Sequence, residues 1–159
     1  MSGFLALEDG AVFPGESVGA RVTGLGEAVF TTGMTGYQEV ATDPSFAGQL
    51  VCFTAPMVGN YGVAAHRCES DRPHARGVVM REARGPDWPG WLAAHGLPAL
   101  TGVDTRSLTL HLREHGALRG SLAATGGDVE TAVELAGSQP SMAGQSLAGW
   151  VSTREPYPF

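Results

Sequence analysis

Short apolar runs separated by glycine- or proline-rich breaks constrain the fold of this chain more than any other feature. The 159 residues include 23 glycines and 10 prolines. In the first half, the runs between these breaks have the length and residue types of β-strands, whereas in the second half strands alternate with short helices. This order predicts an α/β domain with a mixed sheet and few short helices.

Turn and capping residues locate the individual elements. Asp9-Gly10, between apolar runs at residues 4–8 and 11–13, predicts a hairpin with a type I′ turn, which needs positive φ at both central residues. Asp104 and Asp128 predict the N-termini of two helices. The expected helices are at residues 37–41, 90–95, 105–115 and 129–136, and the further strands at 20–23, 27–32, 49–54, 77–81, 98–103 and 118–124.

The strand and helix pattern fades near the C-terminus. We expect residues 1–137 to form the domain and residues 138–159 to form a tail or linker. This tail holds the bulky side chains of Trp150, Tyr157 and Phe159, so it either docks back on the domain or leads to a partner outside this chain. We therefore expect exposed apolar area near the tail, and self-association or poor solubility of the isolated chain.

The basic residues exclude several kinds of chemistry, because all ten are arginine. Without a lysine the chain has no Walker-A phosphate lysine, no Schiff-base lysine for a pyridoxal cofactor and no kinase-type strand lysine. The net charge is −6, and the arginines are scattered among acidic residues. Since nucleic-acid binding needs a clustered basic face, no nucleic-acid partner is expected.

The sequence also bears on location. No segment approaches the roughly 18 consecutive apolar residues that a membrane-spanning helix needs, and the N-terminus has neither the basic nor the apolar region of a signal peptide. The two cysteines, Cys52 and Cys68, do not make a disulfide framework. The expected location is therefore cytoplasmic, with no membrane partner.

Two short motifs suggest catalysis, and each has a simpler structural interpretation. Residues 15–19 match G-x-S-x-G, in which Ser17 would be a nucleophile, but a strand pattern follows where the motif needs a helix. A glycine-rich connection between strands is the favoured interpretation. Residues 111–115 match H-x-x-E-H, which would place His111 and His115 one helical turn apart, as zinc requires.

A zinc site at the H-x-x-E-H motif would need a third protein ligand. The carboxylates that follow it in the sequence, Glu130 and Glu134, belong to another short amphipathic helix. We therefore favour a polar helix face and expect no metal.

Neither cysteine has the surroundings of a nucleophile. Cys52 lies in an apolar strand, where a cysteine is usually a small buried hydrophobe. Cys68 follows Arg67 and has the more exposed pattern, so it is the better reactive thiol. His74 and His95 have no recognisable partner.

The densest unusual stretch lies between residues 33 and 62. It reads GMTGYQE at 33–39, TDPSF at 42–46 and then Pro56, GN at 59–60 and Gly62. Glycines and prolines at this frequency fix a loop path, and such loops often present backbone groups and hydroxyls to a ligand or partner. Ser45 lies at the exit of the Asp-Pro-Ser turn. Rigid structural loops and a binding role are equally compatible with this pattern.

These residues carry a family resemblance. The run EAVFTTGMTGYQEVATDPSFAGQLVCFTAPMVGNYG closely resembles the N-terminal domain of the small subunit of glutamine-hydrolysing carbamoyl phosphate synthetase. LALEDGAVFPGESVG, HARGVVMRE and GVDTRSLTLHLREHGALRG support it in order along the chain. The resemblance covers about residues 4–125 and implies a swivelling β/β/α-type fold. The sequence departs from the family at Gly33 and Ala55, where serine and an aromatic residue are common.

The resemblance implies a function for the chain. The family's small subunit is a glutamine amidotransferase, whose C-terminal half uses a cysteine, a histidine and a glutamate to release ammonia for the large subunit. That half is absent here, so we expect no catalytic residue, no cofactor and no activity of this chain alone. One residue carries over: the serine of the TDPS turn lies at the glutamine site, so Ser45 is expected to bind glutamine.

Three functional hypotheses follow. The first is a docking and support domain of the enzyme that makes carbamoyl phosphate from glutamine, bicarbonate and ATP for pyrimidine and arginine synthesis. Its partners would be the glutaminase domain of the same subunit and the large subunit. The second is a free-standing adaptor or small-ligand-binding domain of the same fold. The third is a hydrolase using Ser17, or a zinc enzyme using His111 and His115.

Overall fold

The computed structural model describes residues 2–153 and 155. The seven strands are β1 (Ser2–Leu7), β2 (Val12–Ser17), β3 (Thr23–Thr31), β4 (Gln49–Phe53), β5 (Gly77–Val79), β6 (Ala99–Thr101) and β7 (Leu118–Ala123). The α-helices are α1 (Tyr37–Thr42), α2 (Asp87–Ala94), α3 (Thr105–His115), α4 (Val129–Ser138) and α5 (Ala148–Val151), and the 3₁₀ turns are η1 (Pro44–Phe46) and η2 (Ala65–Arg67).

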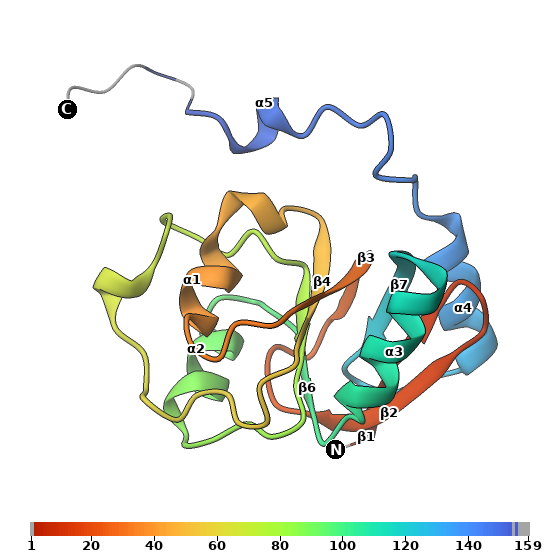
Figure 1. Ribbon diagram of the computed structural model, residues 1–159, viewed down its shortest axis with the longest axis horizontal. Helices are drawn as coiled ribbons and strands as arrows, with labels where there is room; N and C mark the ends of the chain where they lie inside the picture. The colour runs from red at the N-terminus through yellow and green to blue at the C-terminus, as the bar shows by residue number, and fades with distance from the viewer. Residues whose placement is uncertain (1, 154, 156–159) are drawn as a thin grey trace.

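The seven strands close into a barrel in the order β1-β2-β6-β5-β4-β3-β7. The pairs β3–β4, β4–β5 and β5–β6 are parallel, and the other four pairs are antiparallel. Figure 1 shows α1 and α2 on one side of this barrel and α3 and α4 on the other. The predicted α/β class, with a mixed sheet and few short helices, is confirmed, and the closure of the sheet is an addition to it.

Large and small side chains share the interior of the barrel. Leu5 of β1, Leu50 of β4 and Leu122 of β7 are at most 1% exposed and belong to one apolar cluster. Gly77 and Gly120 face this interior, because a Cβ at either position would lie 3.0–3.1 Å from leucine side chains. Small barrels are filled in this way, since bulky residues need small neighbours across the narrow interior.

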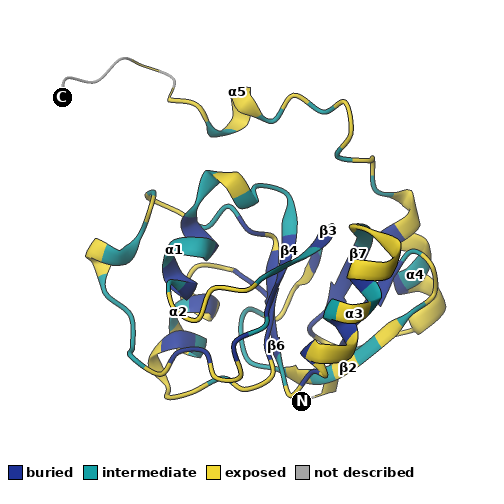
Figure 2. Ribbon diagram, in the orientation of Figure 1, coloured by how far each residue is buried: buried dark blue, intermediate teal, exposed yellow. Residues whose placement is uncertain are grey.

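Helices cover the outside of the barrel in two further apolar layers. Alternation along β4 directs Val51 outward, where it joins Trp88 and Leu92 of α2 in a second cluster. Phe4 of β1 contacts Ala132 of α4 in a third, smaller cluster. Figure 2 shows the strands buried at the centre and the outer helix faces exposed. Within residues 2–153 and 155, no helix has the length and apolar character that crossing a bilayer requires.

The two helices whose N-termini were predicted at Asp104 and Asp128 are confirmed as α3 and α4. Asp104 accepts a hydrogen bond from the backbone N–H of Ser107 at 3.0 Å, and Asp128 accepts one from Thr131 at 2.7 Å. α3 has the bounds that the sequence predicts, and its Leu108 is fully buried. α2 begins earlier than expected, at Asp87, and α4 continues to Ser138.

Two expectations about the N-terminal strands are wrong. The hairpin turn has positive φ at Gly10 alone, and the Gly10 N–H donates to the Leu7 carbonyl, so the loop is a three-residue turn rather than type I′. Residues 20–22 lie outside any strand. The strands expected at 20–23 and 27–32 form one strand, β3 (Thr23–Thr31). β2 extends the run expected at 11–13 as far as Ser17, because pairing with β1 and β6 on its two sides outweighs the low strand propensity of Pro14 and Gly15.

Candidate functional site

The four parallel strands β3, β4, β5 and β6 define two edges of the barrel, one at their carboxyl ends and one at their amino ends. Loops 32–36, 54–64, 80–86 and 102–104 follow the carboxyl ends of β3, β4, β5 and β6 and lie at one edge. The opposite edge carries η1, the start of β4 and the C-terminal tail. Loops at the ends of parallel strands are common ligand and partner sites in α/β domains.

At the carboxyl edge, residues of the GMTGYQE motif hold the loop at residues 54–64 in place; we call this set of contacts the lock. Gln38 is 1% exposed. Its side-chain amide donates to the Ala64 carbonyl at 2.9 Å and accepts from the Ala64 N–H at 3.0 Å. The same amide donates to the sulfur of Cys68 at 3.0 Å. The Gln38 side chain therefore supplies hydrogen-bond partners to Ala64, which lies outside any helix or strand.

Aromatic contacts complete this lock. The ring of Tyr37 stacks on Tyr61 at 4.4 Å and packs against Trp88 at 4.8 Å. The Tyr37 hydroxyl donates to the Gly62 carbonyl at 2.5 Å, and burial raises the pKa of that hydroxyl. The guanidinium of Arg67 lies over the ring of Tyr61, 4.7 Å from its centroid. Tyr37 and Gln38 of the motif therefore have structural roles, whereas Gly33, Met34 and Thr35 are exposed.

Gly59 shows how tightly the locked loop packs. Its φ is +96°, and a Cβ there would lie 2.6 Å from the Arg84 carbonyl oxygen and 2.8 Å from the Cβ of Trp88. No residue with a side chain fits this position without displacing the neighbouring loop. The exposed large hydrophobic side chains of the loops at 32–36 and 54–64 are Met34 and Met57, at 67% and 43% exposure.

Ser45 lies at the other edge of the barrel, within η1. Asp43 shapes this turn by accepting a hydrogen bond from the Ser45 N–H at 2.8 Å, and Pro44 begins it. The Ser45 side chain is exposed, and within the described residues its hydroxyl makes no hydrogen bond. The hydroxyl is therefore available to a group outside the domain.

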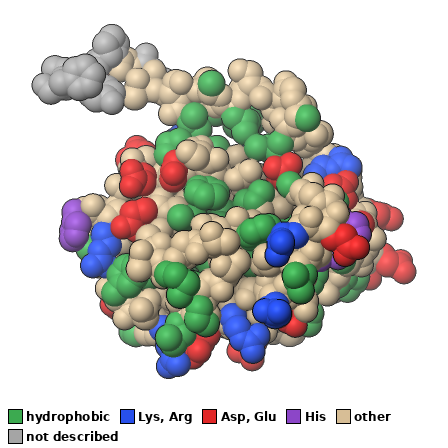
Figure 3. Space-filling model, in the orientation of Figure 1, with side chains coloured by type: hydrophobic (Ala, Val, Ile, Leu, Met, Phe, Trp, Pro, Cys, Tyr) green, Lys and Arg blue, Asp and Glu red, His purple; other side chains and the backbone are tan. Residues whose placement is uncertain are grey.

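The C-terminal tail runs over the same edge as Ser45 (Figure 1). Gly48 lies so close to it that a Cβ would be 3.3 Å from the sulfur of Met142. Arg119 donates to the Gln139 carbonyl at 2.6 Å, which holds the start of the tail to β7. Figure 3 shows hydrophobic side chains gathered where the tail crosses the body.

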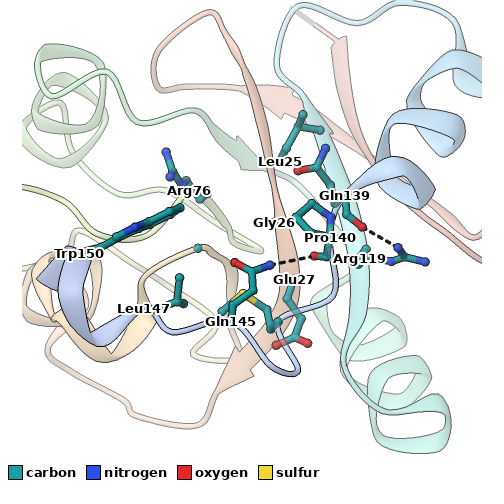
Figure 4. Close-up of a pocket in the computed structure, with 12 residues that line it drawn as sticks. Leu25, Gly26, Glu27, Arg76, Arg119, Gln139, Pro140, Gln145, Leu147 and Trp150 are labelled. Carbon is teal, nitrogen blue, oxygen red and sulfur yellow. Dashed lines mark hydrogen bonds between the residues drawn. The ribbon is translucent and has the colours of Figure 1, made fainter.

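A small hollow of about 140 Å³ remains beneath the tail. Figure 4 shows Arg76, Leu147 and Trp150 around it, with Gln145 donating to the Pro140 carbonyl at 3.3 Å. Trp150 is 63% exposed, as expected for apolar area near the tail. Tyr157 and Phe159, which belong to the same expectation, lie outside the described residues.

An ion pair that no sequence pattern indicates also holds the start of the tail. Arg119 of β7 binds both carboxylate oxygens of Glu8, through its side chain and through its backbone N–H. The side-chain hydrogen bonds from Arg119 hold the pKa of Glu8 below its usual range. Because Arg119 also contacts Gln139, the pair connects β1, β7 and the tail.

The candidate nucleophiles are in unsuitable places. Ser17 ends β2 and pairs with Leu100 of β6, and no helix follows it directly, so the nucleophile-elbow hypothesis is wrong. Cys52 is 1% exposed inside the barrel, and burial raises the pKa of its thiol to about 12. A thiol with that pKa is protonated at neutral pH and does not attack a carbonyl. Cys68 is half-buried and accepts a hydrogen bond from Gln38.

Two histidines, His111 and His115, belong to a cluster of potential metal ligands, whereas His74 and His95 do not. His74 is partly buried, which lowers its pKa, and His95 bonds the Trp91 carbonyl through Nδ1 at 2.8 Å. His111 and His115 lie near Asp9, in the C-terminal half of α3. Glu130 and Glu134, which the sequence offered as third ligands, lie on α4 and are not part of that cluster.

Comparison with known proteins gives one consistent result. The family model described as carbamoyl-phosphate synthase small chain, CPSase domain, matches residues 5–122. Three curated relatives, each named carbamoyl phosphate synthase small chain, come from Nitratidesulfovibrio vulgaris (strain DSM 19637 / Miyazaki F), Parasynechococcus marenigrum and Methanosarcina mazei, and are 47%, 47% and 43% identical to this chain.

These alignments cover 99%, 96% and 98% of this chain, but only 44%, 42% and 45% of the three relatives. The chain therefore spans less than half the length of the curated relatives that it matches.

Proposed function

The chain belongs to the carbamoyl-phosphate synthase small-chain family, and from that premise we propose that it is the N-terminal domain of such a small chain, with a docking and support role. The complete enzyme would make carbamoyl phosphate from glutamine, bicarbonate and ATP, for pyrimidine and arginine synthesis. The observation that carries this proposal is the coverage: the relatives align with nearly all of this chain, yet it spans under half of their length.

The chemistry of the chain supports a non-catalytic role. An amidotransferase needs an accessible thiolate, and the thiol of Cys52 is buried with a pKa of about 12. The glutaminase half of the same small chain is the proposed source of the nucleophile. We expect the isolated domain to need no cofactor and, like the complete enzyme, to be cytoplasmic.

The supporting part of the role is assigned to Ser45. Its hydroxyl is exposed, on a turn that Asp43 holds in one shape. The tail, which would lead to the glutaminase half, crosses the same edge of the barrel and touches Gly48, three residues after Ser45. This arrangement supports the proposal that Ser45 hydrogen-bonds glutamine from across the domain boundary.

The docking part of the role is assigned to the exposed loops at the carboxyl edge. Exposed methionines, such as Met34 and Met57, adapt their shape to a partner surface. They project from loops that Tyr37 and Gln38 hold rigid, so docking costs little conformational entropy. The proposed partner is the large chain of the synthase. A free-standing adaptor is not favoured, because the relatives are more than twice as long as this chain.

Two assays on the purified chain test the proposal. Mixed with the large chain of the same organism, it should elute as a stable complex in size-exclusion chromatography, and Met34→Asp should weaken that complex while Val129→Asp, an exposed position on α4, should not. Supplied with glutamine alone, it should release no ammonia. Robust ammonia release, or a large chain that elutes separately, contradicts the proposal.

A further inference from the structure

Three potential metal ligands meet on the face of the barrel where α3 crosses the β1–β2 turn. Asp9 belongs to that turn, and His111 and His115 lie one helical turn apart on α3. One ligand atom from each residue lies within 4.8 Å of the other two. Asp9 and His111 are 102 residues apart in the sequence, so only the fold brings this carboxylate to the histidine pair.

The cluster already has the supporting contacts that metal-binding histidines need. Nδ1 of His115 bonds the backbone carbonyl of His111 at 2.9 Å, and its Nε2 has no hydrogen bond to another residue that the structure describes. A hydrogen bond of this kind fixes the tautomer and the ring orientation of a ligating histidine. The ring of Phe13 packs edge-on against His111, with centroids 6.0 Å apart, and restricts its movement.

The carboxylate of Asp9 is also oriented by its surroundings. Its Oδ1 accepts a hydrogen bond from the Ala11 N–H at 3.1 Å, as part of the hairpin turn. This contact directs Oδ2 toward α3, where it lies 2.6 Å from Nε2 of His111. The two imidazoles of α3 and the carboxylate of the β1–β2 turn thus come together from separate elements of the fold.

We propose that Asp9, His111 and His115 form a binding site for a divalent transition-metal ion such as Zn²⁺. Two imidazoles and one carboxylate are a ligand set that zinc accepts, with one or more positions left for water. Donor atoms around a tetrahedral zinc lie about 3.3 Å apart, given metal–ligand distances near 2 Å. Donors within 4.8 Å of one another reach that spacing by movements of roughly 1.5 Å, which side-chain rotation supplies.

The site would act as a clamp. It joins the β1–β2 turn to α3, so an ion bound there stabilises the folded barrel over the unfolded chain, in which Asp9 is 102 residues from the nearer histidine. The site is separate from Ser45 and from the carboxyl-edge loops, and the proposal is independent of the docking function.

Calorimetric titration of the purified chain with Zn²⁺ tests this site. The expected result is saturable binding of one ion per chain, with a rise in Tm that a chelator reverses. Loss of an outer-shell partner weakens metal binding by about 10- to 100-fold, so loss of a ligand should raise Kd by about 10-fold or more. We expect this for His115→Ala, whose side chain is exposed, and for Asp9→Asn, which keeps an acceptor for the Ala11 N–H.

His95→Ala is the matched control. His95 makes the same Nδ1 bond to a carbonyl four residues earlier and stacks on the ring at that position, but its neighbour is Trp91 rather than a second histidine. This variant should bind Zn²⁺ like the unchanged chain. Binding that survives His115→Ala, binding that His95→Ala also abolishes, or a zinc-bridged dimer in sedimentation would each overturn the proposed site.

Discussion

Replacing Gln38 by alanine tests the lock between α1 and the loop at residues 54–64. The substitution removes both hydrogen bonds to Ala64 and the one to the sulfur of Cys68. The helix itself should tolerate the change, because alanine has the highest helix propensity. Any loss of stability therefore reports on the lock.

The magnitude follows from the contacts. A neutral hydrogen bond contributes about 1 kcal/mol net, and one to sulfur contributes less. Gln38 is 1% exposed, so the truncation also leaves a gap next to the loop. Together these effects predict a loss of about 2–3 kcal/mol in the free energy of unfolding. For a domain of this size, that loss lowers Tm by roughly 5–10 °C.

Urea denaturation and amide hydrogen exchange measure the effect. The Ala64 amide should exchange faster in Gln38→Ala, because its acceptor is gone. Gln49→Ala is the control, since Gln49 is half-buried and its side chain makes one long hydrogen bond of 3.4 Å. A loss below about 0.5 kcal/mol in Gln38→Ala, with unchanged exchange at Ala64, would refute the lock.

Further predictions address the barrel and its packing. Glu8→Gln should cost about 0.5–1 kcal/mol at pH 7. The folded-state pKa of Glu8 is lowered, so this contribution is present above the ordinary glutamate pKa and lost as the pH falls through the lowered one. Urea titrations of both proteins should therefore show a smaller difference in stability at pH 3 than at pH 7. Gly59→Ala should destabilise by more than about 2 kcal/mol, because positive φ and a 2.6 Å contact both oppose a Cβ, whereas Gly90→Ala, in α2 with open space around it, should stabilise by up to about 1 kcal/mol in thermal melts. An aromatic disulfide reagent should modify Cys68 in the folded chain and Cys52 only after denaturant is added; equal rates for the two thiols would contradict the buried position of Cys52.

Local signals explain what the sequence predicted correctly. Asp104 and Asp128 cap helices through side-chain hydrogen bonds to residues three positions later, so a segment of four residues suffices to locate each N-terminus. The pattern of glycines and prolines between residues 33 and 62 indicated a loop of fixed shape. Position 59 shows one reason, because the close contacts there leave no room for a side chain. The specific spacing of these motifs also carried the family resemblance.

Long-range pairing explains what the sequence did not predict. Closure of the barrel depends on β1 pairing with β7 and on β2 pairing with β6, between segments that no local pattern connects. The same holds for the contact between Asp9 and His111, which supplies the third ligand that the two histidines of the helix motif need. Gln38 seemed to be part of a binding motif, yet its partner, Ala64, carries no side-chain signal.

Competition for the large chain tests the docking role most directly. A fixed amount of the large chain and a full-length small chain from the same organism would be titrated with this chain, and carbamoyl phosphate synthesis would be measured with glutamine or with ammonia as nitrogen source. The account predicts that glutamine-dependent synthesis falls as this chain displaces the full-length subunit, while ammonia-dependent synthesis persists. Glutamine-dependent synthesis that stays constant at saturating amounts of this chain would contradict it.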